Sequence, residues 1–302
     1  MGIYESDISN LLLFINWERD MVGILAAIGA AALFTTMDVF VRFLGHMDTG
    51  EITFWRGLLG LLLLPVLARK VSMPVFSGKH RVILHLRGFF GGAGIFLFFL
   101  SLKGLTLGDA EILAQLAAFF MCFLSPIFLK GKLSHAVVPG LLIITMGTAF
   151  VIQIWNFESF NEYALLGIVS AFFSACAYIA IGMLTDRGGH SGIEIVFYFQ
   201  LYSMIIGAAM MPAHFLWPSG FDWLWIIGMS AAALFAQMML TWACQHVHSL
   251  IVSFAMYTGV LFHVFCGWLF WGELLTIWSW IGGALIIVGS GALLLAGREK
   301  GN

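Results

Sequence analysis

An acid and a base interrupt the first long apolar segment of the chain. In the stretch MDVFVRFLG, which spans 37–45, Asp38 and Arg42 stand four residues apart among Val, Phe and Leu. Residues at this spacing share one face of a helix, so the carboxylate and the guanidinium can pair. A charge held inside a membrane costs about 3 kcal/mol unless it has a partner. The two groups therefore bind a substrate or a proton, open and close a path, or only pair with each other and pack two helices together.

Four more polar side chains stand in apolar segments, at a depth similar to that of Asp38 and Arg42. Arg56 begins the second segment, where its charge could instead extend to the membrane surface. Glu111 could instead stabilise a helix N-terminus, and Gln115 lies one turn further along on the same face. His263 can change its charge near neutral pH, although it could also be a structural histidine. We expect these four side chains to join the first two in one polar network, whose pairing changes during function.

A site for a small molecule also needs apolar and aromatic walls with a few placed polar groups. The further candidates for contact with a ligand are Tyr178, Gln237, Trp242 and Tyr257. The candidates for the wall of a cavity are Phe34, Phe90, Phe96, Phe119 and Ser253. An acid beside aromatic rings would favour a cationic or zwitterionic substrate, through charge pairing and cation–π contact. Most of the 29 phenylalanines must nevertheless face lipid or packed helices.

The sequence contains no pattern that is typical of catalysis, of a cofactor or of a metal site. The four cysteines lie in apolar runs without a CxxC pair, as small hydrophobic side chains do. His246 and His248 have no carboxylate nearby to complete a metal site, and on a helix they would diverge. There is no Ser/His set, HExxH motif, nucleotide-binding loop or basic stripe. We therefore expect no enzyme activity, no cofactor or metal, no nucleic-acid partner and no ATP-driven transport by this chain alone.

The composition of the chain indicates whether it is surrounded by water or by lipid. Of its 302 residues, 61% are hydrophobic and only 10% are charged, and the mean hydropathy is +0.98. A soluble domain has roughly 25% charged residues, so this chain cannot make a fully solvated surface. Nearly uncharged runs of about 18 or more residues recur along it, which is typical of transmembrane helices. The lipid bilayer is therefore a partner, and we expect an all-α polytopic membrane protein.

Hydropathy and its interruptions predict ten spans. They lie near 21–44, 51–68, 83–103, 107–129, 135–154, 162–184, 191–212, 221–243, 248–271 and 275–297. Most match the length that a bilayer requires. We expect a short N-terminal segment (1–20), a first five-helix repeat (21–154), a linker (155–161), a second five-helix repeat (162–297) and a tail (298–302).

The basic residues predict the orientation of the spans. If the N-terminus is cytoplasmic, eleven of the fourteen Lys and Arg residues fall on the inner side. Only Arg42, Arg56 and Lys103 then fall on the outer side. Cytoplasmic loops carry the excess of basic residues in membrane proteins. We therefore expect both termini in the cytoplasm and a multi-pass protein of the inner (plasma) membrane.

Two segments of the chain resemble each other. GKLSHAVVPGLLIITMG (131–147) and GELLTIWSWIGGALIIVG (272–289) each begin with Gly, a charged residue and Leu, and each ends with two glycines seven residues apart. Because five spans is an odd number, the second half must enter the membrane in the opposite direction to the first. Inverted repeats are the architecture of many secondary transporters, which bind substrate near the midplane between the halves. Gly-rich apolar helices can also resemble each other by composition alone.

Larger motifs resemble a known family. They are MDVFVRFL in the first span, GEITFWRGLLGLLLLP in the second, LRGFFGGAGIFLFFLSLKGLTLGDAEIL across the third and fourth, and a C-terminal stretch that contains a W-x-x-x-G-E turn ending at Glu273. Together they are similar to the EamA-type branch of the drug/metabolite transporter superfamily, over about 21–297. The resemblance implies ten helices in two inverted five-helix repeats and transport of small metabolites. It also implies a central cavity lined by the first, third, fourth, sixth, eighth and ninth helices.

Two departures from the family pattern limit what the resemblance implies. Lys132 stands where the first repeat usually has the turn glutamate that Glu273 supplies in the second. The fourth span, ILAQLAAFFMCFLSP, is bulkier and more aromatic than is usual there. Because that span lines the cavity in the family, the identity of the substrate does not carry over from a relative.

The expected function is secondary active transport of a small polar metabolite by alternating access through a central cavity. An amino acid or another cationic or zwitterionic compound is the expected substrate, with a proton or a counter-substrate as coupling partner. Proton coupling would act through Asp38. The alternatives are a membrane subunit or receptor without flux, and an intramembrane enzyme. The protein could act as a monomer or a homodimer.

Overall fold

The protein is helical throughout the part of the chain that its structure, a computed structural model, describes. The described residues are 17–68, 76, 79–128, 138–152, 161–187, 190–211, 215–246, 252 and 255–298. Their helices are α2 (Trp17–Phe43), α3 (Thr49–Ala68), α4 (Arg81–Ser101), α5 (Leu107–Ala114), α6 (Leu116–Phe128), α7 (Val138–Ile152), α8 (Glu162–Arg187), α9 (Gly192–Ala209), α10 (Asp222–His246), α12 (Thr258–Trp271) and α13 (Ile277–Arg298). Most of the N-terminal segment, the linker and the tail lie outside the described residues, as do Lys132 and Ser253.

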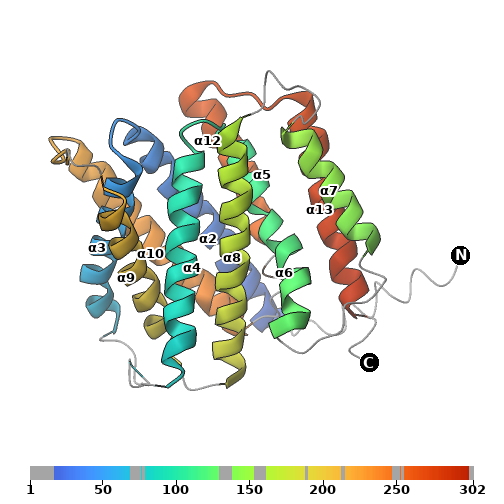
Figure 1. Ribbon diagram of the computed structural model, residues 1–302, viewed down its shortest axis with the longest axis horizontal. Coiled ribbons are helices and arrows are strands. Elements are labelled where there is room, and N and C mark those ends of the chain that lie inside the picture. The colour runs from blue at the N-terminus through green and yellow to red at the C-terminus, as the bar shows by residue number, and fades with distance from the viewer. Residues whose placement is uncertain are drawn as a thin grey trace, which may run out of the picture.

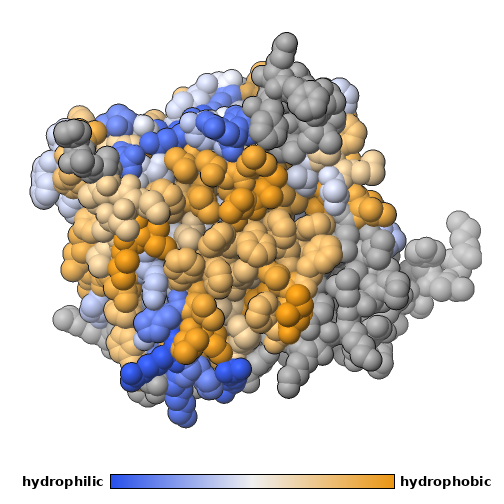
Figure 2. All heavy atoms as spheres, in the orientation of Figure 1, coloured by the Kyte–Doolittle hydropathy of each residue, from blue (hydrophilic) through white to orange (hydrophobic). Residues whose placement is uncertain are grey.

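The helices are those of a membrane protein. Within the described residues, five segments are each long and apolar enough to cross a bilayer: 21–43, 81–101, 162–185, 192–209 and 222–243. Shorter apolar helices cover 142–151, 258–271 and 277–289. Figure 2 shows a broad apolar surface across the middle of the molecule, with hydrophilic residues gathered at its two ends. An apolar band between two polar ends is the surface that a bilayer requires, so the predicted polytopic all-α fold class is confirmed.

The fourth span consists of two helices. α5 ends at Ala114 and α6 begins at Leu116, and Gln115 stands between them with its backbone N–H bonded to the Glu111 carbonyl 3.2 Å away. Neither Gly nor Pro stands at this break. The side-chain amide of Gln115 turns back and donates to Glu111 Oε1 at 2.6 Å. The interruption therefore places two polar side chains of one span side by side inside the bundle.

The closest helix pairs each join one helix from each half of the chain. They include α2 with α10, α3 with α9, α4 with α8 and α7 with α13, and a less extensive pair of the same kind is α5 with α12. In span numbers these pairs are 1–8, 2–7, 3–6, 5–10 and 4–9. Exchanging each span with its counterpart five places along the chain reproduces the same five pairs. Figure 1 shows α3 and α9 at one edge of the bundle and α7 and α13 at the other. This pairing is the arrangement that two inverted five-helix repeats produce.

The glycines of the sequence repeat meet one another between α7 and α13. A Cβ atom on Gly282 would lie 2.5 Å from the carbonyl oxygen of Gly147, and one on Gly289 would lie 2.8 Å from that of Gly140. These separations leave no room for a side chain. Spans five and ten are equivalent in the two repeats, and the first glycine of each span faces the second glycine of the other. The repeated glycines thus allow the closest approach of these two helices.

Candidate functional site

Asp38 and His263 form a buried hydrogen bond between the two halves of the protein. Asp38 lies on α2 and His263 on α12, and their side chains are 2% and 1% exposed. The carboxylate Oδ2 is 2.9 Å from the imidazole Nε2. The other ring nitrogen, Nδ1, is 2.8 Å from the carbonyl oxygen of Gly259 and 3.0 Å from the hydroxyl of Thr35. The histidine therefore connects α2 to the backbone of its own helix.

This geometry places a proton between Asp38 and His263. A carbonyl oxygen can only accept a hydrogen bond, so Nδ1 of His263 must carry a hydrogen toward Gly259. The hydroxyl of Thr35 donates to the carbonyl of Ala31 at 3.0 Å and is free to accept from the same Nδ1–H. Nε2 and Oδ2 then attract each other only if one of them also holds a proton. Without that proton, a nitrogen lone pair would face a carboxylate oxygen.

Glu111 and Gln115 complete one side of this cluster. Glu111 Oε2 is 4.0 Å from His263 Nε2, and Glu111 Oε1 accepts the hydrogen bond from the Gln115 amide. Two acidic side chains thus share one imidazole. Four of the predicted network residues, Asp38, Glu111, Gln115 and His263, lie together in the structure, from α2, α12 and the break between α5 and α6. Their role in transport stays a prediction.

The expected pairing of Asp38 with Arg42 is wrong. Arg42 forms an ion pair with Glu273, in the connection between α12 and α13, and its guanidinium carbon lies 5.2 Å from the ring centre of Trp271. Glu273 Oε2 also accepts the backbone N–H of Leu107 at 3.0 Å, at the first turn of α5. Asp38 points into the bundle, whereas Arg42, in the last turn of α2, reaches the helix connections. Each charge therefore takes a partner from a different part of the fold.

Arg56 does not extend to the membrane surface. Its side chain is 0% exposed, and Nη1 lies 3.3 Å from Gln200 Oε1 and 3.5 Å from the Ser203 hydroxyl, both on α9. Position 56 is about two turns into α3 and faces α9, so the side chain has no path to water. Arg56 also interacts electrostatically with Asp38. The arginine is thus an interior charge that acts on Asp38 through its electric field and not through a hydrogen bond.

From the sequence, Arg87 could attract anions or set the orientation of the spans, and orientation was favoured, whereas Phe199 and Gln200 were missed. Arg87 is 2% exposed on α4, and its guanidinium carbon lies 4.6 Å from the ring centre of Phe199. Arg56 lies 4.8 Å from the same ring. The position of Arg87, six residues inside the apolar helix that begins at Arg81, was the available signal. Phe199 and Gln200 carried no signal, because one more aromatic and one amide in an apolar helix look like ordinary packing.

The other predicted contact residues lie apart from this cluster or at its border. Tyr178, on α8, interacts electrostatically with Arg87 and is 37% exposed. Gln237 is buried on α10, where its amide is 3.5 Å from the Thr241 hydroxyl. Tyr257 packs in an apolar cluster at the start of α12. Trp242 is partly exposed on α10.

The predicted wall residues are half-buried aromatic side chains. Phe34, on α2, packs against two apolar clusters. Phe90 contacts Phe89 and Phe173, and Phe119 contacts Phe120 and Phe123. Phe96 is partly exposed on α4. Whether these rings line a substrate path stays a prediction, and Ser253 lies outside the described residues.

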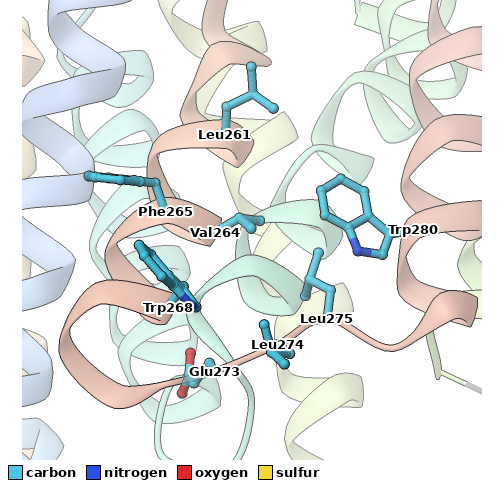
Figure 3. Close-up of a pocket in the computed structure, with 8 residues that line it drawn as sticks. All are labelled: Leu261, Val264, Phe265, Trp268, Glu273, Leu274, Leu275 and Trp280. Atoms are coloured by element: carbon cyan, nitrogen blue, oxygen red, sulfur yellow. The ribbon is translucent and has the colours of Figure 1, made fainter.

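One pocket lies elsewhere, between α12 and α13. It measures about 320 Å³ and is lined by Leu261, Val264, Phe265, Trp268, Glu273, Leu274, Leu275 and Trp280. Figure 3 shows Trp268 and Trp280 flanking it, with Glu273 near one end. Most of these side chains are largely exposed, so the pocket is a groove on the apolar outer surface of the bundle. It does not include the Asp38–His263 pair.

The Arg42–Glu273 pair lies at the end of the bundle that contains the connections 102–108 and 270–277, which we call the Glu273 end. Removing the pair should loosen this end. We expect Arg42→Gln and Glu273→Gln each to speed hydrogen–deuterium exchange about fivefold in peptides covering 102–108 and 270–277. A partly exposed ion pair contributes about 1 kcal/mol or less, which corresponds to such a factor. Glu162→Gln, which removes an exposed acid near the same end, is the control. Unchanged exchange in both variants would mean that the pair does not hold the connections together.

The fold and the buried charges define a ten-helix membrane transporter built from two inverted repeats. The chain belongs to the EamA-like transporter family, whose model matches 21–153 and 161–295. The resemblance to EamA-type drug/metabolite transporters is therefore confirmed. The name of the family describes its members as transporters.

Individual relatives cover nearly the whole chain. "Pseudopaline exporter CntI" of Pseudomonas aeruginosa is 32% identical over 281 residues, which cover 92% of this chain and 97% of the relative. An "Uncharacterized transporter" of Archaeoglobus fulgidus is 29% identical, with 94% and 99% covered. Mouse "Solute carrier family 35 member G1" is 23% identical, with 88% and 76% covered. A crystal structure that covers 91% of this chain, with 98% of its own length matched, has a TM-score of 0.62 at 22% identity, and it supports the fold alone.

Proposed function

We propose that this protein is a secondary active transporter that exports a small polar metabolite by alternating access, coupled to a proton. Membership of a transporter family supports transport. The similarity to a protein named as a pseudopaline exporter supports the direction and the class of substrate. A buried network of charged side chains between the two repeats supports coupling, because intramembrane ionisable groups in transporters mark ion and substrate paths.

The buried contact between Asp38 and His263 is the observation that carries this proposal. The two residues belong to different repeats, and alternating access moves one repeat relative to the other. Release of the proton would turn the attraction between Nε2 and Oδ2 at 2.9 Å into repulsion. The contact between α2 and α12 would then weaken. Gain or loss of one proton thereby shifts the balance between two arrangements of the repeats.

Several polar contacts close the Glu273 end of the bundle. Besides Arg42 with Glu273, the Leu216 N–H donates to Glu51 Oε1 at 2.7 Å. Asp222 lies 3.2 Å from the imidazole of His46. These contacts tie connections of the first half to connections of the second. We infer that the structure represents the state closed at this end, and that these contacts break when the protein opens there.

The charge distribution supports an orientation for this state. Arg81 and Arg187 lie at the end opposite Glu273, where the excess of basic residues gathers. Basic residues favour the cytoplasmic side. The Glu273 end would then face the outside of the inner membrane. In this orientation the substrate enters from the cytoplasm while the Arg42–Glu273 contacts are closed.

Flux measurements test the proposal. Proteoliposomes that contain the purified protein and internal labelled pseudopaline should release it faster than protein-free vesicles, and an imposed pH gradient should change the rate. A panel of labelled amino acids and related zwitterions, measured in parallel, identifies a different substrate. The absence of any protein-dependent flux across the whole panel, by a protein that is folded and monodisperse, would refute transport and favour a receptor or a subunit without flux.

A further inference from the structure

Two arginines are buried in the bundle without a carboxylate partner. Arg56 comes from α3 and Arg87 from α4, and both guanidinium groups pack on the ring of Phe199 from α9. Their side chains are 0% and 2% exposed. Among the described residues, neither arginine forms an ion pair. The interior of this part of the bundle therefore holds two positive charges that the described part of the protein does not neutralise by direct contact.

Several hydrogen-bond donors in this cluster are also unused. Within the described residues, Arg56 Nε and Nη2 and Arg87 Nε and Nη1 are buried with no acceptor. The amide nitrogen Nε2 of Gln200, whose Oε1 accepts from Arg56, is likewise buried and has no acceptor. Buried donors without partners are rare in native proteins, because their desolvation is not compensated. Four such nitrogen atoms on two arginines that share one ring, together with the amide of Gln200 beside Arg56, call for an acceptor that binds there.

Internal packing explains only part of this arrangement. The face of Phe199 attracts both guanidinium groups, but a ring face offers no acceptor to N–H groups that point away from it. Asp38 acts on Arg56 electrostatically without a direct hydrogen bond: its Oδ2 is bonded to His263, and its buried Oδ1 forms no hydrogen bond to either arginine. A guanidinium matches a carboxylate closely, because two parallel N–H groups meet two oxygens. The acceptor that fits the cluster is therefore an anion with planar oxygen pairs.

We propose that the transported metabolite carries carboxylate groups and that Arg56 and Arg87 bind them, with Gln200 as a further donor. This assignment rests on the proposed transport function and specifies its substrate. It disfavours a purely cationic substrate, which two buried guanidinium groups would repel. A carboxylate bound at Arg56 would also lie next to the Asp38–His263 pair. The charge on that pair, and hence its proton, would then respond to the presence of the substrate.

Ligand-dependent thermal unfolding of the full-length protein in lipid nanodiscs tests the assignment. The probes are iminodiacetate and nitrilotriacetate, which carry two and three carboxylates on one amine, and iminodiacetamide, which is the uncharged match. At about 10 mM, which detects millimolar dissociation constants, the two acids should raise the unfolding temperature and the amide should not. Equal stabilisation by the amide, or no stabilisation by either acid, would overturn the proposal.

Variants of Arg87 separate ligand binding from a structural role. Arg87→Gln should weaken acid binding about 30-fold or more, because a buried charged hydrogen-bond partner is lost, and Arg87→Lys should retain part of the affinity. Without ligand, Arg87→Gln should unfold at the same temperature as the parent or higher, since it removes an unpaired buried charge. Arg81→Gln, on the same helix but exposed, is the matched control. A large fall in the ligand-free unfolding temperature of Arg87→Gln, or equal loss of binding in Arg81→Gln, would contradict the assignment.

The flux assay distinguishes failure of this inference from failure of the proposed function. Protein-dependent export that continues in Arg87→Gln with an unchanged KM would reject the carboxylate site and leave transport intact. Acid binding that depends on Arg87, together with no flux of any compound, would instead support the anion site and reject transport. Export of a carboxylate whose KM rises in Arg87→Gln supports both.

Discussion

Asp38→Asn is expected to abolish the response of transport to a pH gradient. An amide at this position can donate permanently to His263 Nε2, so the hydrogen bond across 2.9 Å survives but no longer gains and loses a proton. Gradient-driven export should fall about 100-fold, which is typical for the loss of an essential proton-transfer group. Exchange of labelled for unlabelled substrate should continue, because it needs both arrangements of the repeats but no net proton movement.

The measurement compares two modes of flux in the same proteoliposomes. Gradient-driven export and exchange at equal pH are recorded for the parent, for Asp38→Asn and for His263→Gln. Glu162→Gln is the control, because this acid is exposed at the start of α8 and lies outside the buried network. Thermal unfolding shows whether each variant is folded. If a folded Asp38→Asn protein exports with the gradient dependence of the parent, Asp38 does not carry the coupling proton.

Gly207→Leu is expected to prevent α3 and α9 from packing. A Cβ at Gly207 would overlap the backbone of Phe54, and one at Gly57 would overlap the backbone of Met204. Backbone atoms cannot move aside as the end of a flexible side chain can, so the two helices would have to separate. Overpacking of this kind costs about 3 kcal/mol or more, which predicts a fall of about 10 °C in the unfolding temperature. The same separation would displace Arg56 from Gln200.

Gly182 provides the matched control for that substitution. It lies within α8, where a Cβ would have no atom of the described protein within 4 Å. Gly182→Leu should therefore leave the unfolding temperature unchanged or raise it, because Leu favours a helix more than Gly does. Size-exclusion chromatography and thermal unfolding in the same detergent compare the two variants. A Gly207→Leu protein as stable as Gly182→Leu would show that the close crossing of α3 and α9 is not required.

The fold could be predicted from sequence because its main determinants are local. The predicted span 51–68 became α3 (Thr49–Ala68), and 162–184 became α8 (Glu162–Arg187). Apolar length and interrupting charges determine these boundaries within a few residues. The repeat was visible because its glycines, such as Gly147 and Gly282, meet at the contact between α7 and α13 and must stay small in both halves.

The site could be predicted only in part, since its contacts join distant positions. Asp38, Glu111, Gln115 and His263 were identified because a polar group in an apolar run is conspicuous. The partner of Arg42 was assigned wrongly, because spacing along one helix indicates which side chains can meet and not which ones do. Because Arg87 is a basic residue near a helix end, it was counted among the residues that indicate the cytoplasmic side. In the structure it lies in the interior of the bundle.

By itself, the sequence determined that the chain crosses a membrane ten times, that its halves are inverted repeats and that costly polar groups lie within its spans. These properties depend on composition and local order. Only the tertiary structure decided that Asp38 meets His263, 225 positions away, that Arg42 meets Glu273 and that two arginines share Phe199. These contacts depend on how helices rotate and cross, and a difference of one residue in helical phase turns a side chain by about 100°. Composition alone does not determine that phase.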